Sequence, residues 1–441
     1  MYSSSTRLCY SLIQRDLPAL CISRFGSPVK NPLKRLSSPA SVYHQSFRDN
    51  MNSKPVTLTE ASAVLASSST ACSMGTSTSR LYSALAQPLN SAPLAPPEPC
   101  PEEEAEEAAA HAAPADPNAL LRECEEALRN RPPRLHRGFI FPRDGTPLSQ
   151  PIRVMQWNIL AQALGEGKDG FIQCPLDALN WAERKYLILE EILTYHPDIL
   201  CLQEVDHYFD TFQPVLNSLG YHSTFCPKPW SPCLDVEHNN GPDGCALFFK
   251  CDRFKLLDSI SLRLAALALK TNQVAIVQTL QCRASGRPLC VAVTHLKARS
   301  GWERLRSAQG SDLLQSLRTA TGGADGIPLL VCGDFNAEPS EDVYRRFASS
   351  SLGLDSAYKQ LSLDGQTEPP YTSWKIRPSG ESCHTLDYIW YTRHALRVDS
   401  VLDLPTEEQI GPGRLPSYSY PSDHLSLVCD VRFRDDPDQP L

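Results

Sequence analysis

The stretch Leu330-Val331-Cys332-Gly333-Asp334-Phe335-Asn336-Ala337-Glu338-Pro339 decides how the rest of the chain is interpreted. An apolar run ends at a glycine, a carboxylate and an amide follow two residues apart, and a proline closes the turn. Side chains alternate along a strand, so Asp334 and Asn336 are expected on one face while Phe335 packs into the core. An acid and an amide at a strand end are suited to holding a phosphate beside a metal ion. An Asx-type turn is the structural alternative.

The composition of the chain indicates a globular protein with an additional segment. Its 441 residues are many for one domain. No stretch reaches the roughly 18 to 20 apolar residues of a membrane span. The 16 cysteines form no CxxC pair, which disfavours zinc knuckles and disulfide scaffolds and favours reduced thiols. The formal net charge of −8 disfavours an extended nucleic-acid surface but allows a local basic pocket.

The N-terminal segment differs in composition from the rest of the chain. Residues 1–48 are rich in serine and basic residues and contain a single acid, Asp16. This composition is typical of a mitochondrial transit peptide, and a disordered basic tail is the alternative. Met51 or Met74 could start a shorter form that stays in the cytoplasm.

A linker is expected between this segment and the folded domain. Residues 58–114 are rich in Ser, Ala and Pro and carry an acidic run, so they contain too few large apolar side chains to offset the entropy of ordering. We predict a targeting segment and linker over residues 1–115 and a catalytic domain over residues 116–441. A short helix is predicted over Asn118–Asn130, before a pair of prolines.

Two apolar runs early in the domain carry polar residues that a core strand does not need. A strand is predicted over Ile152–Leu160 with Asn158 near its end, and a second over Asp198–Val205 with Glu204 near its end. A carboxylate after a mostly apolar run is costly unless it is paired or binds a metal. Glu204 is therefore the candidate metal ligand, and a salt bridge at the rim of the sheet is the alternative.

Two helices and further strands are predicted between and after these runs. One helix begins at Asn180, with Glu183 completing a capping box, and ends before Pro197. The other helix runs from Trp302 to Thr319. The further strands are predicted over Cys245–Phe249, Val274–Leu280, Leu289–Val293, Leu386–Tyr391 and Ser426–Phe433. The second and third of these bracket a turn and are expected to form an antiparallel hairpin.

Several of these strands also begin or end at chemically useful groups. His295 follows the hairpin, Asp387 stands at the start of the next strand, and His424 precedes the last strand. These groups, with those already named, are the components of metal-assisted hydrolysis at phosphorus. Mg²⁺ prefers oxygen ligands and typically takes one or two carboxylates, with water and substrate phosphate completing its shell.

The same groups allow assignments for proton transfer and charge stabilisation. His424 could take a proton from the attacking water if Asp387 held its other ring nitrogen. Asn158, Asn336 and His295 could donate hydrogen bonds to phosphate oxygens as negative charge builds.

Seven ordered motifs resemble those of the endonuclease/exonuclease/phosphatase family, in its deadenylase-like branch. They are MQWNIL, LCLQEVD, DGCALFFK, VTHLKA, VCGDFNAEP, LDYIWY and PSDHLSL. The resemblance implies the deoxyribonuclease I-like α/β fold, a four-layer α/β/β/α sandwich of two mixed β-sheets flanked by helices. It also implies the following roles: Glu204 as the Mg²⁺ ligand, Asn158, Asp334 and Asn336 around the phosphate, His295 as a phosphate contact, and His424 with Asp387 as the hydrolytic dyad.

The substrate is where the chain departs from the main deadenylases. No leucine-rich docking repeat precedes the domain, and Leu296-Lys297-Ala298-Arg299 stands where those enzymes carry a Trp-Asp-Pro-type stretch. The resemblance implies instead a phosphatase that removes the 2′-phosphate of NADP⁺ and NADPH, giving NAD⁺ and NADH. The alternatives are a 3′-exonuclease on the poly(A) tails of mRNA, which would have RNA or RNA-decay factors as partners, and a scaffold on RNA-decay machinery. A monomer is expected.

Basic residues near the motifs suit the first hypothesis. Lys228, Lys297, Arg299 and Arg377 are candidate contacts, with Asn336, for a terminal phosphate dianion and a pyrophosphate. The alternative for each base is a solvated surface charge.

Overall fold

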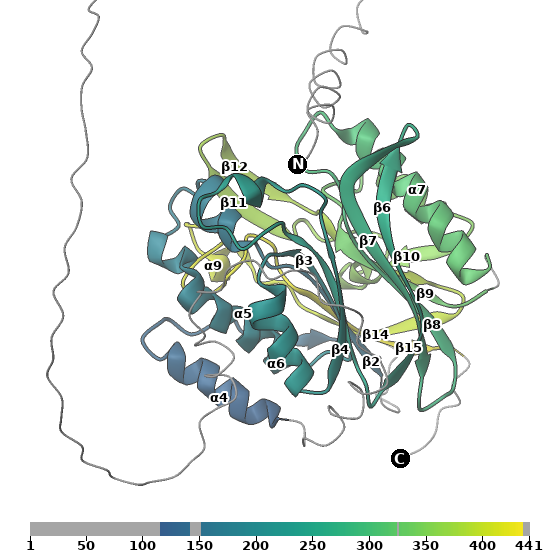
Figure 1. The fold of residues 1–441 in the computed structure, drawn as a ribbon, viewed down its shortest axis with the longest axis horizontal. Coiled ribbons are helices and arrows are strands. Elements are labelled where there is room, and N and C mark those ends of the chain that lie inside the picture. The colour runs from purple at the N-terminus through teal and green to yellow at the C-terminus, as the bar shows by residue number, and fades with distance from the viewer. Residues whose placement is uncertain (1–114, 142–150, 324–325, 435–441) are drawn as a thin grey trace, which may run out of the picture. The chain divides into compact units, whose positions relative to one another are not determined.

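The computed structural model describes residues 115–141, 151–323 and 326–434. These residues form two β-sheets packed face to face, with helices on both outer sides (Figure 1). The predicted four-layer α/β/β/α sandwich is confirmed. The predicted targeting segment and nearly all of the predicted linker lie outside the described residues.

The first sheet has seven strands in the order β1-β14-β15-β2-β3-β5-β4. Their bounds are β1 (Phe139–Ile140), β14 (Leu396–Leu402), β15 (Leu427–Phe433), β2 (Ile152–Asn158), β3 (Ile199–Val205), β5 (Gly244–Lys250) and β4 (Tyr221–Pro227). Strands β2 and β3 are parallel, so their carboxyl ends, with Asn158 and Glu204, lie at one edge of the sheet. All other neighbours in this sheet are antiparallel.

The second sheet has six strands in the order β10-β13-β9-β8-β7-β6. Their bounds are β10 (Leu354–Ser356), β13 (Asp387–Thr392), β9 (Leu329–Asp334), β8 (Pro288–His295), β7 (Leu269–Cys282) and β6 (Phe254–Ala266). Strands β8 and β9 are parallel, and their last residues, His295 and Asp334, are register partners. Strand β13 runs antiparallel to β9, which sets its first residue, Asp387, opposite Asp334. A separate hairpin pairs β11 (Ser373–Arg377) with β12 (Gly380–His384).

Apolar side chains from both sheets form the core between them. Val154 and Cys201 of the first sheet share one buried cluster with Val291, Cys332 and Ile389 of the second. Strands packed on both faces require near-continuous apolar runs, which is why these segments could be predicted as strands. Full burial of each valine or isoleucine side chain contributes about 1.5–3 kcal/mol.

Helices cover the outer faces of the sheets. Their bounds are α4 (Pro117–Ala127), α5 (Trp181–Tyr195), α6 (Gln213–Ser218), α7 (Glu303–Thr321), α8 (Asp342–Ala348) and α9 (Glu407–Ile410). Shorter helical turns are η2 (Ala163–Lys168), η3 (Leu176–Leu179), η4 (Tyr208–Phe212), η5 (Pro232–Asp235) and η6 (Ala357–Leu361). Helix α5 packs Ile188 and Ile192 into the cluster that includes Met155 of β2, and α7 packs Leu313 and Leu317 against the second sheet. Figure 1 shows α5 and α7 on opposite sides of the sandwich.

The predicted helix start at Asn180 is confirmed, but its capping box is wrong. The Asn180 side chain accepts a hydrogen bond from the Ala182 backbone N–H at 2.9 Å, as an N-cap does. The Glu183 carboxylate does not return to the cap and instead pairs with Arg131. Glu183 therefore pairs with an arginine from a distant segment instead of accepting a local backbone hydrogen bond. The helix that was predicted to begin at Asn118 begins one residue earlier, at Pro117, because Asp116 is its N-cap.

Two further observations concern the described residues as a whole. None of their helices combines the length and the apolar character that crossing a bilayer requires. Their cysteines, most of them buried, carry free thiols.

Candidate active site

Polar groups from both sheets meet where the parallel strands end. Asn158 and Glu204 come from the first sheet, and His295, Asp334 and Asp387 come from the second. Because carboxyl ends of parallel strands lie at one edge, and both parallel pairs end on the same side of the sandwich, segments far apart in sequence converge there.

The Asn158 side chain links two carboxylates. Its Nδ2 lies 3.0 Å from Glu204 Oε1 and 3.0 Å from Asp334 Oδ2. Its Oδ1 accepts a hydrogen bond from the Leu160 backbone N–H at 3.1 Å. The amide is therefore fixed by its own turn and can donate only toward the carboxylates.

A local irregularity in β3 directs Glu204 into the site. The pairing of β3 with β5 shifts register between Leu202 and Val205, and Glu204 adopts a left-handed φ of 57°. Bulges of this kind re-aim a side chain and are frequent beside active sites. Glu204 Oε2 accepts the Ala161 backbone N–H at 3.3 Å. No ion pair to Glu204 forms among the described residues, so the predicted salt-bridge alternative does not hold there.

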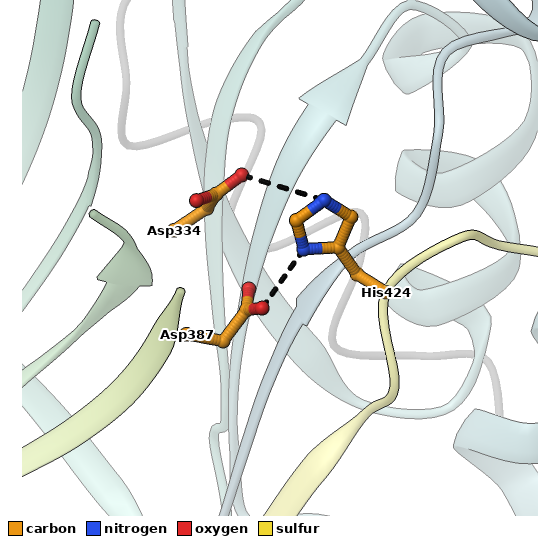
Figure 2. Close-up of side chains that lie close together, drawn as sticks. All are labelled: Asp334, Asp387 and His424. Carbon is orange, nitrogen blue, oxygen red and sulfur yellow. Dashed lines mark hydrogen bonds and ion pairs between the residues drawn. The ribbon is translucent and has the colours of Figure 1, made fainter. Parts of the chain in front are cut away.

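His424 and Asp387 form a buried pair. His424 Nδ1 lies 2.8 Å from Asp387 Oδ2, and His424 Nε2 lies 3.8 Å from Asp334 Oδ2 (Figure 2). Asp387 also accepts hydrogen bonds from Thr372 Oγ1 at 2.7 Å and from Gln156 Nε2 at 3.1 Å. The carboxylate is thus fully engaged, and the imidazole can exchange a proton only through Nε2.

Burial and neighbouring charges shift the pKa values of these groups. Burial raises the pKa of Glu204 to about 7 and that of Asp334 to about 6. Burial lowers the pKa of His424, but the carboxylates of Asp387 and Asp334 outweigh it and raise this pKa to about 9. Burial, with the charges of Lys228 and His424, holds the pKa of His295 well below its usual range. Burial therefore disfavours the charged forms of Glu204 and Asp334, and a bound cation would stabilise them.

A divalent cation fits these residues. Ligand atoms of Asp334, Asp387 and His424 lie within 4.8 Å of one another. Asp387 and His424 already satisfy each other through a hydrogen bond, whereas Glu204 and Asp334 are linked only through the Asn158 amide. Carboxylate oxygens are among the ligands that hard cations prefer. Glu204 and Asp334 are the residues that would hold such a cation.

Of the predicted basic contacts, Lys228 and Arg377 lie at the site. Lys228 is buried, its Nζ 2.5 Å from Asp243 Oδ2 and 3.4 Å from His295 Nδ1. Arg377 pairs with Asp169 at 2.6 Å and with Asp423 at 3.5 Å.

The other two predicted bases stand on the loop that follows His295. Lys297 is half-buried, with its Nζ 5.6 Å from the centre of the Trp302 ring. Burial and the charge of Arg299 lower the pKa of Lys297. Arg299 is exposed and has a left-handed φ of 81°. Of the four bases, Arg299 alone is exposed, as its surface-charge alternative expects.

The expectation that Asp334 and Asn336 share one strand face is wrong. Strand β9 ends at Asp334, and Asn336 has a left-handed φ of 51°. Its backbone N–H donates to Asp334 Oδ1 at 2.8 Å, which forms the Asx turn that was the structural alternative. The Asn336 amide donates to the Leu296 carbonyl at 3.1 Å. The turn thus orients the Asp334 carboxylate and ties it to the loop after His295.

Sequence reasoning missed Lys375. This residue is buried in β11, pairs with Asp423, and lies 3.4 Å from His424 Nε2. The alternation of Lys375 with Arg377 in a strand was the available signal, because it puts both bases on one face. Only the fold brings that face to His424. Gln156, Thr372 and Asp243 were missed for the same reason.

Comparison with known proteins agrees with this geometry. The family model described as Endonuclease/Exonuclease/phosphatase family matches residues 155–424. Nocturnin of Homo sapiens is 63% identical over 448 residues, covering 99% of this chain and 99% of that protein. The solved structure of the human Nocturnin catalytic domain with bound sulfate anion is similar with a TM-score of 0.59 and 66% identity, covering 69% of this chain and 99% of that one.

A more distant solved structure has the same fold. ANGEL2, a 2′,3′-cyclic phosphatase, in complex with adenosine-2′,3′-vanadate, is similar with a TM-score of 0.57 and 26% identity, covering 68% of this chain and 99% of that one. The matched residues contain the whole polar cluster from Asn158 to His424. The chain therefore belongs to the endonuclease/exonuclease/phosphatase family of phosphoester hydrolases.

Proposed function

We propose that this protein is a Mg²⁺-dependent phosphatase that hydrolyses the 2′-phosphate of NADP⁺ and NADPH. The observation that carries the proposal is a pair of buried ammonium groups, each beside one of the two histidines. Lys228 Nζ lies 3.4 Å from His295 Nδ1, and Lys375 Nζ lies 3.4 Å from His424 Nε2. Two cations so close to the reacting centre suit a compact terminal phosphate dianion.

The chain's own groups divide the work of hydrolysis at phosphorus. Asp387 holds His424 by Nδ1, so Nε2 is the atom that exchanges a proton with water or with a phosphate oxygen. Asn158 holds the carboxylates of Glu204 and Asp334 through its amide, and His295 supplies an N–H group where negative charge develops on the phosphate. Mg²⁺, when bound at Glu204 and Asp334, would supply charge neutralisation and polarise the phosphate.

Two related solved structures hold phosphate-like groups, which supports a phosphate ester as the substrate. The human Nocturnin catalytic domain holds a sulfate, an anion with the shape of phosphate. ANGEL2 holds an adenosine with vanadate joined at its ribose 2′ and 3′ oxygens. The 2′-phosphate of NADP(H) is likewise attached to the ribose of an adenosine, and this likeness supports the proposal.

Other basic residues suit the rest of the substrate. Lys297 and Arg299 stand on the loop that follows His295, and Arg377 stands on the other side near Asp423. We assign these groups to the pyrophosphate of the dinucleotide, because a planar guanidinium suits two neighbouring phosphates. A poly(A) chain distributes one charge per nucleotide and depends on base stacking along a track.

Product analysis tests the proposal. Purified protein with Mg²⁺ is incubated in parallel with NADPH and with oligo(A), and free phosphate and AMP are measured. We expect phosphate and NADH from NADPH, with much slower release of AMP. Rapid AMP release without phosphate would instead support the 3′-exonuclease.

A further inference from the structure

Two buried arginines hold the loops of the site by their backbones. Arg184 near the start of α5 is 0% exposed, and Arg306 near the start of α7 is 2% exposed. These helices lie on opposite sides of the sandwich (Figure 1). A buried guanidinium is costly unless its donors are satisfied, so its partners indicate what it is there to hold.

Arg184 binds carbonyl groups on two separate loops. Its Nη1 donates to the Ile159 carbonyl at 2.8 Å and to the Pro421 carbonyl at 3.1 Å, and its Nη2 donates to the Leu160 carbonyl at 2.7 Å. The first and third carbonyls directly follow Asn158, and the second stands at the start of the loop of the catalytic histidine. No ion pair to Arg184 forms in the described part of the chain. The hydrogen bonds of its guanidinium therefore fix the positions of backbone carbonyls.

The turn that Arg184 holds is strained. Leu160 has a left-handed φ of 60°, which a branched residue adopts only when its surroundings enforce it. That conformation lets the Leu160 N–H reach Asn158 Oδ1 while the Leu160 carbonyl faces Arg184. Asn158 in turn bridges Glu204 and Asp334. Arg184 thus fixes the amide that sets the distance between the two carboxylates.

Arg306 makes the corresponding contacts on the other side. Its Nη1 donates to the Lys297 carbonyl at 3.1 Å and to the Arg299 carbonyl at 2.7 Å. Arg299 has a left-handed φ of 81°, so this guanidinium also holds a strained carbonyl. Its Nε and Nη2 bind Glu341 at 3.0 and 2.9 Å, which anchors the clamp to the start of α8. The loop held here carries Lys297 and Arg299 and none of the reacting groups.

We propose that Arg184 and Arg306 are positioning residues with separable effects. Arg184 sets the geometry of the reacting groups and of the metal site, so its loss reduces kcat and metal affinity. Arg306 sets the position of Lys297 and Arg299, so its loss raises KM for a phosphate-rich substrate. The second half rests on the proposed function, because it assumes that these two bases contact the substrate.

The test compares Arg184→Lys and Arg306→Lys in the full chain. Lysine keeps the charge, but its single nitrogen cannot reproduce the planar fork that reaches several carbonyls. Arg432→Lys is the control, because Arg432 is also buried and pairs with Asp399 far along β15 from the site. The measurements are kcat and KM for NADPH, and Mn²⁺ affinity by calorimetry without substrate.

The expected results differ between the two variants. For Arg184→Lys we expect kcat to fall by about 100-fold, as small misplacements of reacting groups do, with KM nearly unchanged. Its Mn²⁺ affinity should fall by about 10-fold, the usual effect of losing support behind a metal ligand. For Arg306→Lys we expect KM to rise by about 10-fold, with kcat and Mn²⁺ affinity unchanged. The control should match the parent in all three.

The proposal would be overturned if the two variants changed kcat and KM by the same factors. It would also be overturned if they lost thermal stability while kcat, KM and Mn²⁺ affinity stayed at the parental values. If Arg184→Lys does not fold, Arg184→Met keeps the buried volume and is judged by the same measurements. If the parent releases no phosphate from NADPH, the proposed function fails independently. The Mn²⁺ affinities, and kcat with oligo(A), then still decide the role of Arg184.

Discussion

Glu204 is a half-buried acid whose pKa is raised to about 7 by burial, so the fold does not favour its charge. A residue that costs stability and is aimed by a bulge is expected to serve function. Glu204→Ala should therefore fold with unchanged or higher thermal stability and lose turnover with millimolar Mg²⁺. Phosphate release and thermal unfolding check both statements. The control is Glu338→Ala, which removes a half-exposed acid on the neighbouring loop that pairs with His384. Parental rates in Glu204→Ala would refute the metal assignment.

His424 is held by Asp387 so that one nitrogen remains available for proton exchange. His424→Ala should lower kcat by about 10²–10⁴-fold, the usual contribution of a positioned acid or base, and leave KM nearly unchanged. Steady-state kinetics with NADPH measure both parameters. His384→Ala is the matched control, because this imidazole is half-exposed and pairs with Glu338 at the surface. A change confined to KM would make His424 a binding residue.

Helices α7 and α8 touch through a glycine. A Cβ on Gly310 would stand 2.5 Å from Val343 Cγ2 and 3.3 Å from Phe347 Cε2. Alanine normally stabilises a helix interior by about 1 kcal/mol relative to glycine. Here overpacking should reverse the sign, and Gly310→Ala should lower the free energy of unfolding by about 1–3 kcal/mol.

Denaturant unfolding measures the effect of Gly310→Ala, and a second substitution isolates its cause. Val343→Ala removes the contacting methyl groups, so the double variant should be more stable than additivity of the two single changes predicts. Simple additivity would show that the helices do not meet as closely as the structure has them.

The strands that could be predicted are those with continuous apolar runs. β2, β3, β5, β9, β13 and β15 are buried on both faces, so hydrophobicity alone marks them. Strands β4 and β6 could not be predicted. Both lie at sheet edges, and most of their residues are exposed or partly exposed, so neither contains a continuous apolar run. Their strand conformation comes from pairing with β5 and β7, which is information that a local pattern does not contain.

The site was predictable where a polar residue interrupts an apolar strand. Glu204, Asp334 and Asp387 stand out for that reason. Lys375 did not, because its burial follows from the packing of the β11–β12 hairpin against the last loop, where Ser373 pairs with His424. The left-handed turn at Leu160 was equally hidden, since leucine rarely adopts this conformation, whereas the Asx-type turn at Asn336 was among the alternatives that the sequence allowed.

At the scale of the whole molecule, the described fold begins at Ala115, whose N–H donates to the Ser218 carbonyl at 2.7 Å. Removal of residues 1–114 should therefore leave kcat/KM unchanged in solution. If the predicted transit peptide is used, the same truncation should abolish mitochondrial location in cells. Fluorescence microscopy of tagged full-length and truncated proteins checks this, and import of the truncated form would place the signal elsewhere.

Removal of residues 1–141 provides the contrast. Glu191 is buried and pairs with Arg134 and Arg137, which this larger deletion would remove. Breaking a buried ion pair from one side typically costs about 3–5 kcal/mol, so the shorter protein should unfold at much lower denaturant concentration. Equal stability of the two truncations would show that the Arg134–Arg137 segment is dispensable.

The central claim is that this site acts on a compact phosphate monoester. Substitution of Lys297 and Arg299 tests this claim most directly. The measurement is kcat/KM for NADPH and for oligo(A), in the parent and in Lys297→Ala and Arg299→Ala. We predict that each variant loses about 10- to 100-fold with NADPH, or about 1.4–2.7 kcal/mol of charge-assisted contacts, while thermal stability barely changes. Oligo(A) cleavage should be weak in the parent and little altered. Parental activity of both variants with NADPH, together with robust oligo(A) cleavage that the variants lose, would contradict the phosphatase and support the exonuclease.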